Sequence, residues 1–392
     1  MALCYKGDIA REPIVTQASR GKAGSLAVVP EAAWDAQDDR FAEAFQILQS
    51  AIASKAFPAA AVAVTHEGKL VAYKGFGRLT YEAASAEIHA NTIFDLASLT
   101  KAVATTTMSM LLYERGELDL EAPVCHVLPQ MCGTDARRRD ITFRMLLAHS
   151  SGLPGYVRLF DLAKTHDELI AAAMDTPLIA KPGTQTEYSD IGFLILGEAL
   201  ARIADEPLDR FCQREIFGPL AMSRTGFVPP QEWRKTIPPT EDDQSFRKRI
   251  IKGEVQDENA SVMGGVAGHA GLFAPAEDVA TFAHSLLSGG RPVLRPGTVA
   301  LFTRREESPP GTSRTLGWDT PSRPSQSGTM FSPRSFGHLG YAGTSLWLDP
   351  EREISITLLT SRTWPDRKSQ AIKEVRPAYH DAIMKVLLES GK

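Results

Sequence analysis

A serine and a lysine three residues apart, Ser98 and Lys101, form the pair in this sequence best suited to chemistry. Residues i and i+3 share one face of a helix, so the Lys101 amine can reach the Ser98 hydroxyl. The free N–H groups at the start of that helix would favour a developing alkoxide or oxyanion. The pair therefore predicts an acylatable serine with an amine as its proton partner. The alternative is a helix-capping serine followed by a surface lysine.

The surroundings of Ser98 separate it from two other Ser-x-x-Lys matches. Ser19 lies in a polar leader, and Ser245 lies in the charged run 241–249, which is typical of a solvated loop. Ser98 instead follows the short apolar segment 92–97 and precedes the apolar stretch 102–113, which has few helix breakers before Gly116. We therefore expect a buried helix to begin at Ser98.

Two further segments could supply a proton relay and oxyanion donors. Tyr188 and Asp190 place a phenol and a carboxylate two residues apart, on a turn before the apolar helix predicted over 191–203. His338 and Gly340 come immediately before a predicted strand around Leu346. A glycine there lets another backbone or a ligand approach closely.

In this order, Ser98-Leu-Thr-Lys101, Tyr188-Ser-Asp190 and His338-Leu-Gly340 resemble the three motifs of the β-lactamase and penicillin-binding-protein superfamily of serine hydrolases. The likeness is greatest to its class C-like and esterase branch and covers about residues 38–390. Segments 146–154 and 268–273 are similar to loops often seen in that superfamily. The resemblance implies an α+β fold, in which an antiparallel sheet flanked by helices carries an inserted, mostly helical domain.

The resemblance also implies roles for five residues. Ser98 would be the acylated nucleophile, Lys101 its proton partner, and Tyr188 the phenol that passes the serine proton to the leaving group. Gly340 would keep the strand edge open. The backbone N–H groups of Ser98 and Tyr341 would form the oxyanion hole, where loss of one donor costs about 3 to 4 kcal/mol in the barrier.

Asp190 stands where many members of the superfamily carry asparagine. For Lys101 to act as a neutral base at pH 7, its pKa must fall by about three units from ~10.4, which costs roughly 4 kcal/mol. An ionised Asp190 about 4 Å away would favour the ammonium by a similar ~4 kcal/mol. If Asp190 faces inward, we expect a cationic Lys101 and Tyr188 as the better base. The alternative role for Asp190 is a helix N-cap.

His338 stands where Lys-Thr-Gly enzymes carry a lysine. A histidine is mostly neutral at pH 7 and holds a carboxylate less well than a lysine does. This replacement favours esters or uncharged amides over substrates that present a carboxylate there. The alternative is a structural histidine bonded to a loop carbonyl.

Other side chains are weaker candidates. Trp318 and Tyr341 could line an acyl pocket as substrate-binding or supporting residues, although an aromatic in such a run often belongs to the core. His149 and His269 are expected to brace loops rather than to titrate in catalysis.

The composition is that of an ordinary globular protein. The 392 residues are 43% hydrophobic, and the formal net charge of -4 offers no field for nucleic acid or anionic lipid. Four cysteines lack metal-ligand or disulfide spacing, which favours unpaired thiols in a reducing compartment. We expect no metal, cofactor, nucleic-acid partner or membrane span, and the oligomeric state stays open. No signal peptide is visible, so we expect a cytoplasmic protein, or an exported one if the native N-terminus is missing.

Periodicity predicts the organisation of the chain. Residues 1–36 form a flexible leader. Hairpins are expected over 59–76 and 344–360, and helices over 41–52, 144–148, 167–174, 278–287 and 378–388. No strand is predicted between 98 and about 259. We therefore divide the chain into a sheet domain from 37–97 and 266–392, and a helical domain from 98–265.

These residues predict a serine hydrolase that forms an acyl-enzyme at Ser98 and acts on a small-molecule ester or amide. A carboxylesterase for small or medium esters is the leading interpretation. The alternatives are a β-lactamase, a D-aminopeptidase or D,D-peptidase-like amidase, an acyltransferase, and a penicillin-binding or sensor-like protein that does not turn over.

Overall fold

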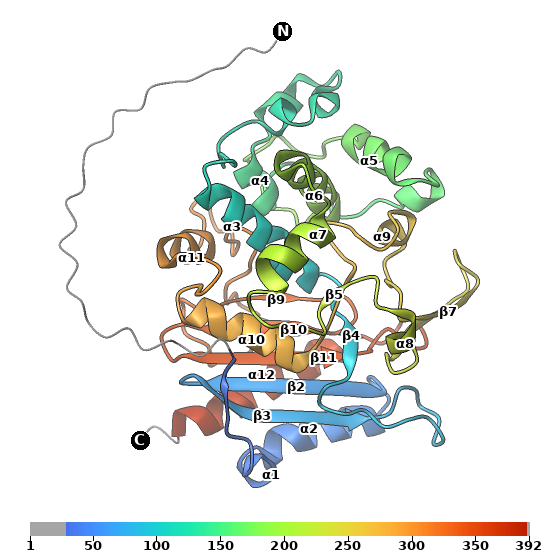
Figure 1. Cartoon of the computed structure of the whole chain (residues 1–392), viewed down its shortest axis with the longest axis vertical. Coiled ribbons are helices and arrows are strands. Elements are labelled where there is room, and N and C mark those ends of the chain that lie inside the picture. The colour runs from blue at the N-terminus through green and yellow to red at the C-terminus, as the bar shows by residue number, and fades with distance from the viewer. Residues whose placement is uncertain (1–28, 390–392) are drawn as a thin grey trace, which may run out of the picture.

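The computed structural model describes residues 29–389 of the chain (Figure 1). Ser19, Cys4 and most of the predicted leader lie outside this range. The described strands are β1 (Glu31–Ala32), β2 (Ala59–His66), β3 (Lys69–Gly77), β4 (Ile93–Asp95), β5 (Gly226–Phe227), β6 (Pro239–Asp243), β7 (Arg249–Lys252), β8 (Leu272–Pro275), β9 (Phe336–Leu339), β10 (Ser345–Asp349) and β11 (Ile354–Thr360).

Helices lie between the strands along the chain. They are α1 (Gln37–Arg40), α2 (Ala42–Ala53), the π-helical η1 (Lys101–Thr106), α3 (Thr107–Glu114), α4 (Phe143–Leu147), α5 (His166–Asp175), α6 (Asp190–Ala204), α7 (Leu208–Cys212), α8 (Gln231–Arg234), α9 (Glu258–Val262), α10 (Ala276–Leu287), α11 (Pro296–Thr303) and α12 (Ile372–Glu389). No helix within residues 29–389 is both long and apolar enough to cross a membrane.

A six-stranded sheet joins the two ends of the chain in the order β1-β3-β2-β11-β10-β9. The predicted hairpins are confirmed as β2–β3 and β10–β11, and β2 pairs directly with β11. Alternate residues of β2 face opposite layers: Ala61 and Ala63 pack in the core shared with α10, whereas Val62 and Val64 pack with α2 and α12. Figure 1 shows α10 on one side of the sheet and α2 and α12 on the other. The predicted mixed sheet-and-helix fold is confirmed.

The predicted helices all form, with bounds that differ by a few residues. Helix α12 differs most, because it begins at Ile372 rather than near 378. The helix expected directly after Ser98 begins with wide π-turns over Lys101–Thr106 and becomes α-helical only in α3. A threonine hydroxyl accompanies the wide turn, since Thr107 Oγ1 donates to the carbonyl of Ala102, five residues earlier, at 3.2 Å.

The expectation of no strand between 98 and 259 was wrong. Strands β6 and β7 form an antiparallel hairpin in the charged run that was expected to be a solvated loop. The buried carboxylate of Asp243 organises this hairpin by accepting hydrogen bonds from the backbone amides of Ser245, Phe246 and Arg247. The residues of this hairpin are mostly charged or polar, so apolar and polar side chains do not alternate along it. That alternation is the pattern by which a strand is predicted from sequence.

Two further details concern the predicted organisation. Residues Glu31–Ala32, within the expected leader, pair in parallel with β3. Strand β8 pairs with both β4 and β5, so one small sheet draws on both predicted domains. The division into a sheet domain and a helical domain stays a prediction.

Candidate active site

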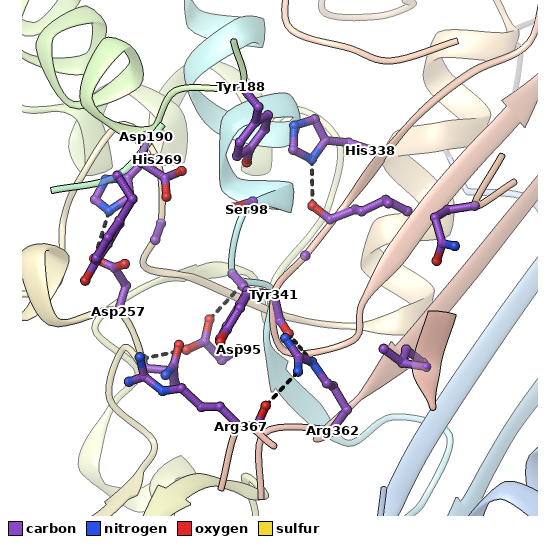
Figure 2. A pocket seen from close by; sticks show the side chains of 18 of the residues that line it. Asp95, Ser98, Tyr188, Asp190, Asp257, His269, His338, Tyr341, Arg362 and Arg367 are labelled. Atoms are coloured by element: carbon purple, nitrogen blue, oxygen red, sulfur yellow. Dashed lines mark hydrogen bonds and ion pairs between the residues drawn. The ribbon is translucent and has the colours of Figure 1, made fainter. Parts of the chain in front are cut away.

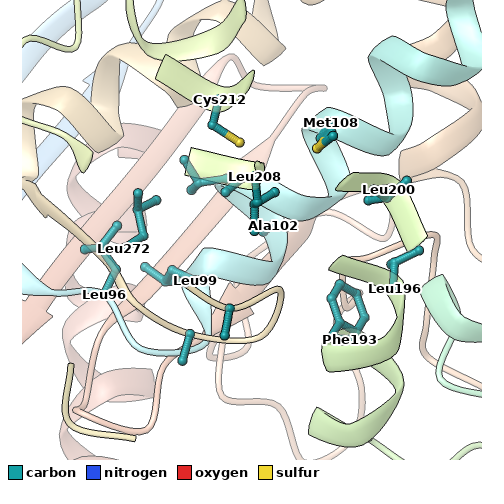
Figure 3. Close-up of a cluster of buried hydrophobic side chains, with 14 of the residues drawn as sticks. Leu96, Leu99, Ala102, Met108, Phe193, Leu196, Leu200, Leu208, Cys212 and Leu272 are labelled. Carbon is teal, nitrogen blue, oxygen red and sulfur yellow. The ribbon is translucent and has the colours of Figure 1, made fainter. Parts of the chain in front are cut away.

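Ser98 lies at a strained turn between β4 and the buried helix. Ala97 has a φ of 48°, a left-handed conformation that is uncommon for a residue with a Cβ. The carboxylate of Asp95 holds this turn by accepting from the Ala97 amide at 2.8 Å. On the other side, Leu99 and Ala102 are fully buried, and Figure 3 shows them in a hydrophobic cluster with Phe193 and Leu208. The turn presents Ser98 to a cavity of about 640 Å³ while the helix stays anchored in the core.

The Lys101 amine meets the Ser98 hydroxyl as the spacing predicted. Lys101 Nζ donates to Ser98 Oγ at 2.9 Å and to the His269 carbonyl at 3.1 Å. Its side chain has no exposed surface and lies 2.7 Å from Asp190 Oδ1. Burial disfavours the charged amine, but Asp190 and Tyr188 outweigh this effect and raise the pKa of Lys101. Lys101 is therefore an ammonium at neutral pH.

Tyr188 converges on the same two side chains. The Lys101 ammonium lies 4.9 Å from the centre of the Tyr188 ring, and Tyr188 lines the same cavity as Ser98. Burial raises the pKa of Tyr188, although the Lys101 charge and the hydrogen bonds with Lys101 and Ser98 oppose this rise. Because Lys101 donates to Ser98 Oγ, the Ser98 proton is free to point at the phenolic oxygen.

Two neighbours of Tyr188 fix the second motif. Ser189, rather than Asp190, caps α6, since its hydroxyl accepts from the Gly192 amide at 2.9 Å. The capping role considered for Asp190 is thus wrong, and its carboxylate faces Lys101. His149 braces the turn as expected: its Nδ1 accepts from the Ser189 amide at 3.0 Å, and its ring packs on Tyr188 with centres 4.6 Å apart.

The third motif, at the end of β9, lines the same cavity as Ser98. Gly340 leaves no room for a side chain, because a Cβ there would lie 1.9 Å from Thr344 Oγ1 and 2.6 Å from the Leu96 carbonyl oxygen. Within residues 29–389, the backbone amides of Ser98 and Tyr341 donate to no protein acceptor. Both residues line the cavity, so these two amides are available to a bound oxyanion.

His338 is neutral and oriented. Its Nδ1 lies 2.8 Å from the Leu339 carbonyl oxygen, so Nδ1 carries the proton. Nε2 is then an acceptor, and it has no hydrogen-bond partner within the described residues. Burial, together with the positive charges of Lys101 and Arg314, lowers the pKa of His338 to about 3. The ring therefore supplies no cation at this position.

Trp318 does not belong to the site. Its side chain is buried in the core between Phe282 and Phe336, with ring centres 6.3 Å and 5.2 Å away, and it is not part of the cavity wall. Its neighbour Asp319 lines the cavity instead. The packing of the indole against Phe282 and Phe336 decides this outcome.

Several cavity residues were not found from the sequence. Asp257 pairs with His269 at 2.8 Å; burial raises the pKa of this acid, but the His269 charge and hydrogen bond lower it to about 2. Figure 2 shows Tyr188, His338 and Asp190 at one end of the pocket and Arg362 and Arg367 at the other. Nothing local in the sequence marks these arginines, because they come from a loop after β11.

Within residues 29–389, no cluster of three or more His, Cys, Asp or Glu side chains is arranged to hold a metal.

Comparison with known proteins adds to this geometry. The family model described as Beta-lactamase matches residues 44–378. The chain belongs to the beta-lactamase family. A relative from Salmonella agona (strain SL483), named provisionally as a D-alanyl-D-alanine carboxypeptidase, is 33% identical over 306 residues, which are 69% of this chain and 70% of the relative.

Solved structures are also similar to this chain in fold. EstCE1, a hydrolase with promiscuous acyltransferase activity, has a TM-score of 0.74 at 21% identity and covers 89% of this chain and 99% of its own. The octameric penicillin-binding protein homologue from Pyrococcus abyssi has a TM-score of 0.69 at 20% identity. The match covers 89% of this chain and 77% of that homologue. At these identities the likeness concerns the fold alone.

Proposed function

We propose that this member of the beta-lactamase family is a carboxylesterase that forms an acyl-enzyme at Ser98. The observation that carries the proposal is the convergence of Lys101 Nζ, 2.9 Å from Ser98 Oγ, with the Tyr188 phenol at the edge of an open cavity. A hydroxyl with a proton acceptor on one side and two free amides nearby is the arrangement that acyl transfer needs.

The reaction follows from the protonation states. With Lys101 held as an ammonium, Tyr188 in its phenolate form accepts the Ser98 proton as Oγ attacks the carbonyl carbon. The amides of Ser98 and Tyr341 bind the oxygen that becomes negative. The C–O bond to the alcohol then breaks, and Tyr188 donates the proton to the departing oxygen. Water hydrolyses the acyl-enzyme by the same route in reverse, which restores the Ser98 hydroxyl.

The neutral third motif supports an ester as the substrate. His338 offers an acceptor, Nε2, where a cation would hold a carboxylate beside the scissile bond. The structural neighbour EstCE1, a hydrolase with promiscuous acyltransferase activity, is consistent with acyl transfer at Ser98. The relative named as a carboxypeptidase supports D-alanyl amide cleavage as the second candidate.

The experiment compares a p-nitrophenyl butyrate assay with a chromogenic β-lactam and a D-alanyl-D-alanine amide. We expect the ester to have the highest kcat/KM, and Ser98→Ala to lose both turnover and the acyl adduct detected by intact-mass spectrometry. Ser50→Ala, an exposed change on α2, is the matched control. A higher kcat/KM for either amide would replace the ester assignment. One equivalent of label without steady-state release would show a sensor instead.

The cytoplasmic location expected from the first residues stays a prediction, because those residues lie outside the described range.

A further inference from the structure

Two buried arginines at the far end of the cavity have no carboxylate partner. Arg362 and Arg376 both line the cavity and are only 6% and 4% exposed. Within residues 29–389, neither guanidinium makes an ion pair at 4 Å or less with an acidic side chain. A buried charge is costly unless a partner of opposite charge balances it. Within the described residues, therefore, no carboxylate balances the charges of these two guanidinium groups.

Arg376, on α12, is held by neutral groups from other segments. Its Nη1 donates to Gln326 Oε1 at 3.1 Å and its Nη2 to the Thr344 carbonyl at 3.2 Å. Its Nε is buried and has no acceptor among the described residues. Burial and the nearby charge of Arg362 lower the pKa of Arg376 to about 9, so the group remains charged at pH 7 and is repelled by its neighbour.

Arg362 contacts Tyr341, whose backbone amide is one of the two proposed oxyanion donors. Its Nε donates to the Tyr341 carbonyl at 2.7 Å, its Nη1 donates to the Ser369 carbonyl at 3.1 Å, and the guanidinium lies 4.3 Å from the centre of the Tyr341 ring. Tyr341 therefore lines the same cavity as Ser98 and holds Arg362 through its carbonyl. Figure 2 shows Arg362 well separated from Tyr188 and His338 within the pocket.

The acidic side chains of the cavity are all engaged by other groups. Asp190 pairs with Lys101, Asp257 with His269, Glu258 with Arg367 and Asp319 with Arg314, and Asp95 accepts from the amides of Ala97 and Gln256. Arg314 and Arg367, the other two arginines of the cavity, each form an ion pair with one of these acids. Of the four, only Arg362 and Arg376 lack an acid within the described residues.

We propose that Arg362 and Arg376 form a carboxylate-binding subsite, so that the enzyme prefers esters whose acyl chain ends in a carboxylate remote from the scissile bond. The planar forks of two guanidinium groups match the two oxygens of a carboxylate. A bound carboxylate would supply an acceptor for Arg376 Nε and neutralise the repulsion between the two cations. The subsite is distinct from the third motif beside Ser98, where His338 is uncharged. This substrate class rests on the proposed esterase function.

The test uses two esters of equal chain length: mono-p-nitrophenyl adipate, which ends in a carboxylate, and its methyl ester, which ends in a neutral group. We expect wild type to favour the carboxylate ester, with a kcat/KM ratio that falls about tenfold to a hundredfold in Arg376→Gln. Arg376→Lys, which keeps the charge, should recover part of the ratio. Lys235→Gln removes an exposed positive charge away from the cavity and should leave the ratio unchanged.

A binding measurement keeps the proposal testable without turnover. Adipate should raise the Tm of Ser98→Ala and should not raise that of Ser98→Ala/Arg376→Gln, because a ligand stabilises only the form that binds it. If Arg376→Gln does not fold, adipate should still inhibit wild-type hydrolysis of the methyl ester competitively, and the neutral diamide of adipic acid should not.

The two proposals fail differently. An unchanged ester ratio in Arg376→Gln, or an equal Tm rise in both Ser98→Ala proteins, would overturn the carboxylate subsite while leaving the esterase intact. A Tm rise with inorganic phosphate but none with adipate would also overturn it. Absence of turnover for both esters would overturn the esterase, and the adipate Tm shift would still decide the subsite.

Discussion

The Asp190 carboxylate lies 2.7 Å from the Lys101 amine, within the same pocket wall as the nucleophile. This contact holds Lys101 in its charged form. In the proposed mechanism, Tyr188 is therefore the group that accepts the Ser98 proton. In this proposal, the Asp190 carboxylate keeps Lys101 as a cation, and the proton transfers are carried out by the Tyr188 phenol.

Replacing Asp190 with asparagine should move the pH–rate profile. Asp190 raises the pKa values of both Lys101 and Tyr188, so its removal lowers both. Because kcat/KM rises with pH as the proton acceptor loses its proton, the rising limb of the profile in Asp190→Asn should shift to lower pH. The measurement is kcat/KM for p-nitrophenyl butyrate from pH 5 to 10. Asp167→Asn, on an exposed turn of α5, is the control, and a limb that stays in place would contradict the assignment.

Removing the phenol should remove most of the activity. Tyr188→Phe keeps the ring that packs on His149 and loses only the hydroxyl, so the fold should remain. We expect kcat/KM to fall about 10²- to 10⁴-fold, the usual range for a general acid–base. Tyr113→Phe removes a hydroxyl from a half-exposed ring on α3 and serves as the control. A loss below about tenfold in Tyr188→Phe would assign the base to another group.

Adding one methyl group at Gly340 should damage the oxyanion site. The new Cβ would collide with Thr344 Oγ1 and the Leu96 carbonyl, which shifts the adjoining Tyr341 amide. We expect Gly340→Ala to lose about 10²-fold or more in kcat, comparable to the loss of one oxyanion donor, together with a lower Tm. Gly297→Ala has no neighbour within 4 Å and should not lower the Tm. Full activity in Gly340→Ala would show that the amide of Tyr341 is not used.

The buried carboxylate of Asp243 should be worth several kcal/mol to the fold. It pairs with Arg247 at 3.0 Å, and that arginine also donates to the carbonyls of Val255 and Gln256, beside Asp257. Asp243→Ala leaves the Arg247 charge unpaired, so we expect the free energy of unfolding to fall by about 3 to 5 kcal/mol in urea titrations. Asp242→Ala, at an exposed neighbouring position, should change it by less than about 0.5 kcal/mol.

The pH dependence of that difference has a definite sign. Although burial acts in the opposite direction, hydrogen bonds from Phe246 and Arg247 hold the pKa of Asp243 below its ordinary value. Its contribution is therefore complete above about pH 4 and declines as the pH falls below that value. The gap in unfolding free energy between wild type and Asp243→Ala should narrow at pH 3, and a gap that widens there would contradict this account.

Local patterns were sufficient for the parts of the protein that depend on near neighbours. The spacing of Ser98 and Lys101 fixes their contact because three residues make about one helical turn. The hairpins β2–β3 and β10–β11 are marked by apolar runs on both sides of a short turn. The placement of these hairpins before and after the helical block predicted one split sheet, but the direct pairing of β2 with β11 was not predicted.

Other features depend on burial and on contacts between distant segments, which a sequence pattern does not contain. Whether Asp190 caps a helix or faces Lys101 is decided by Ser189, which takes the capping position. The side of the backbone on which Trp318 lies depends on the packing of Phe282 and Phe336.

The sequence by itself thus determined the three motifs, their order and the secondary structure that carries them, since each depends on residues a few positions apart. Only the tertiary structure decided the charge of the site. It made His338 neutral and Lys101 charged, and it left Arg362 and Arg376 without an acid. The physical reason is that a charge is set by desolvation and by the nearest opposite charge, and both arise only when distant parts of the chain pack together.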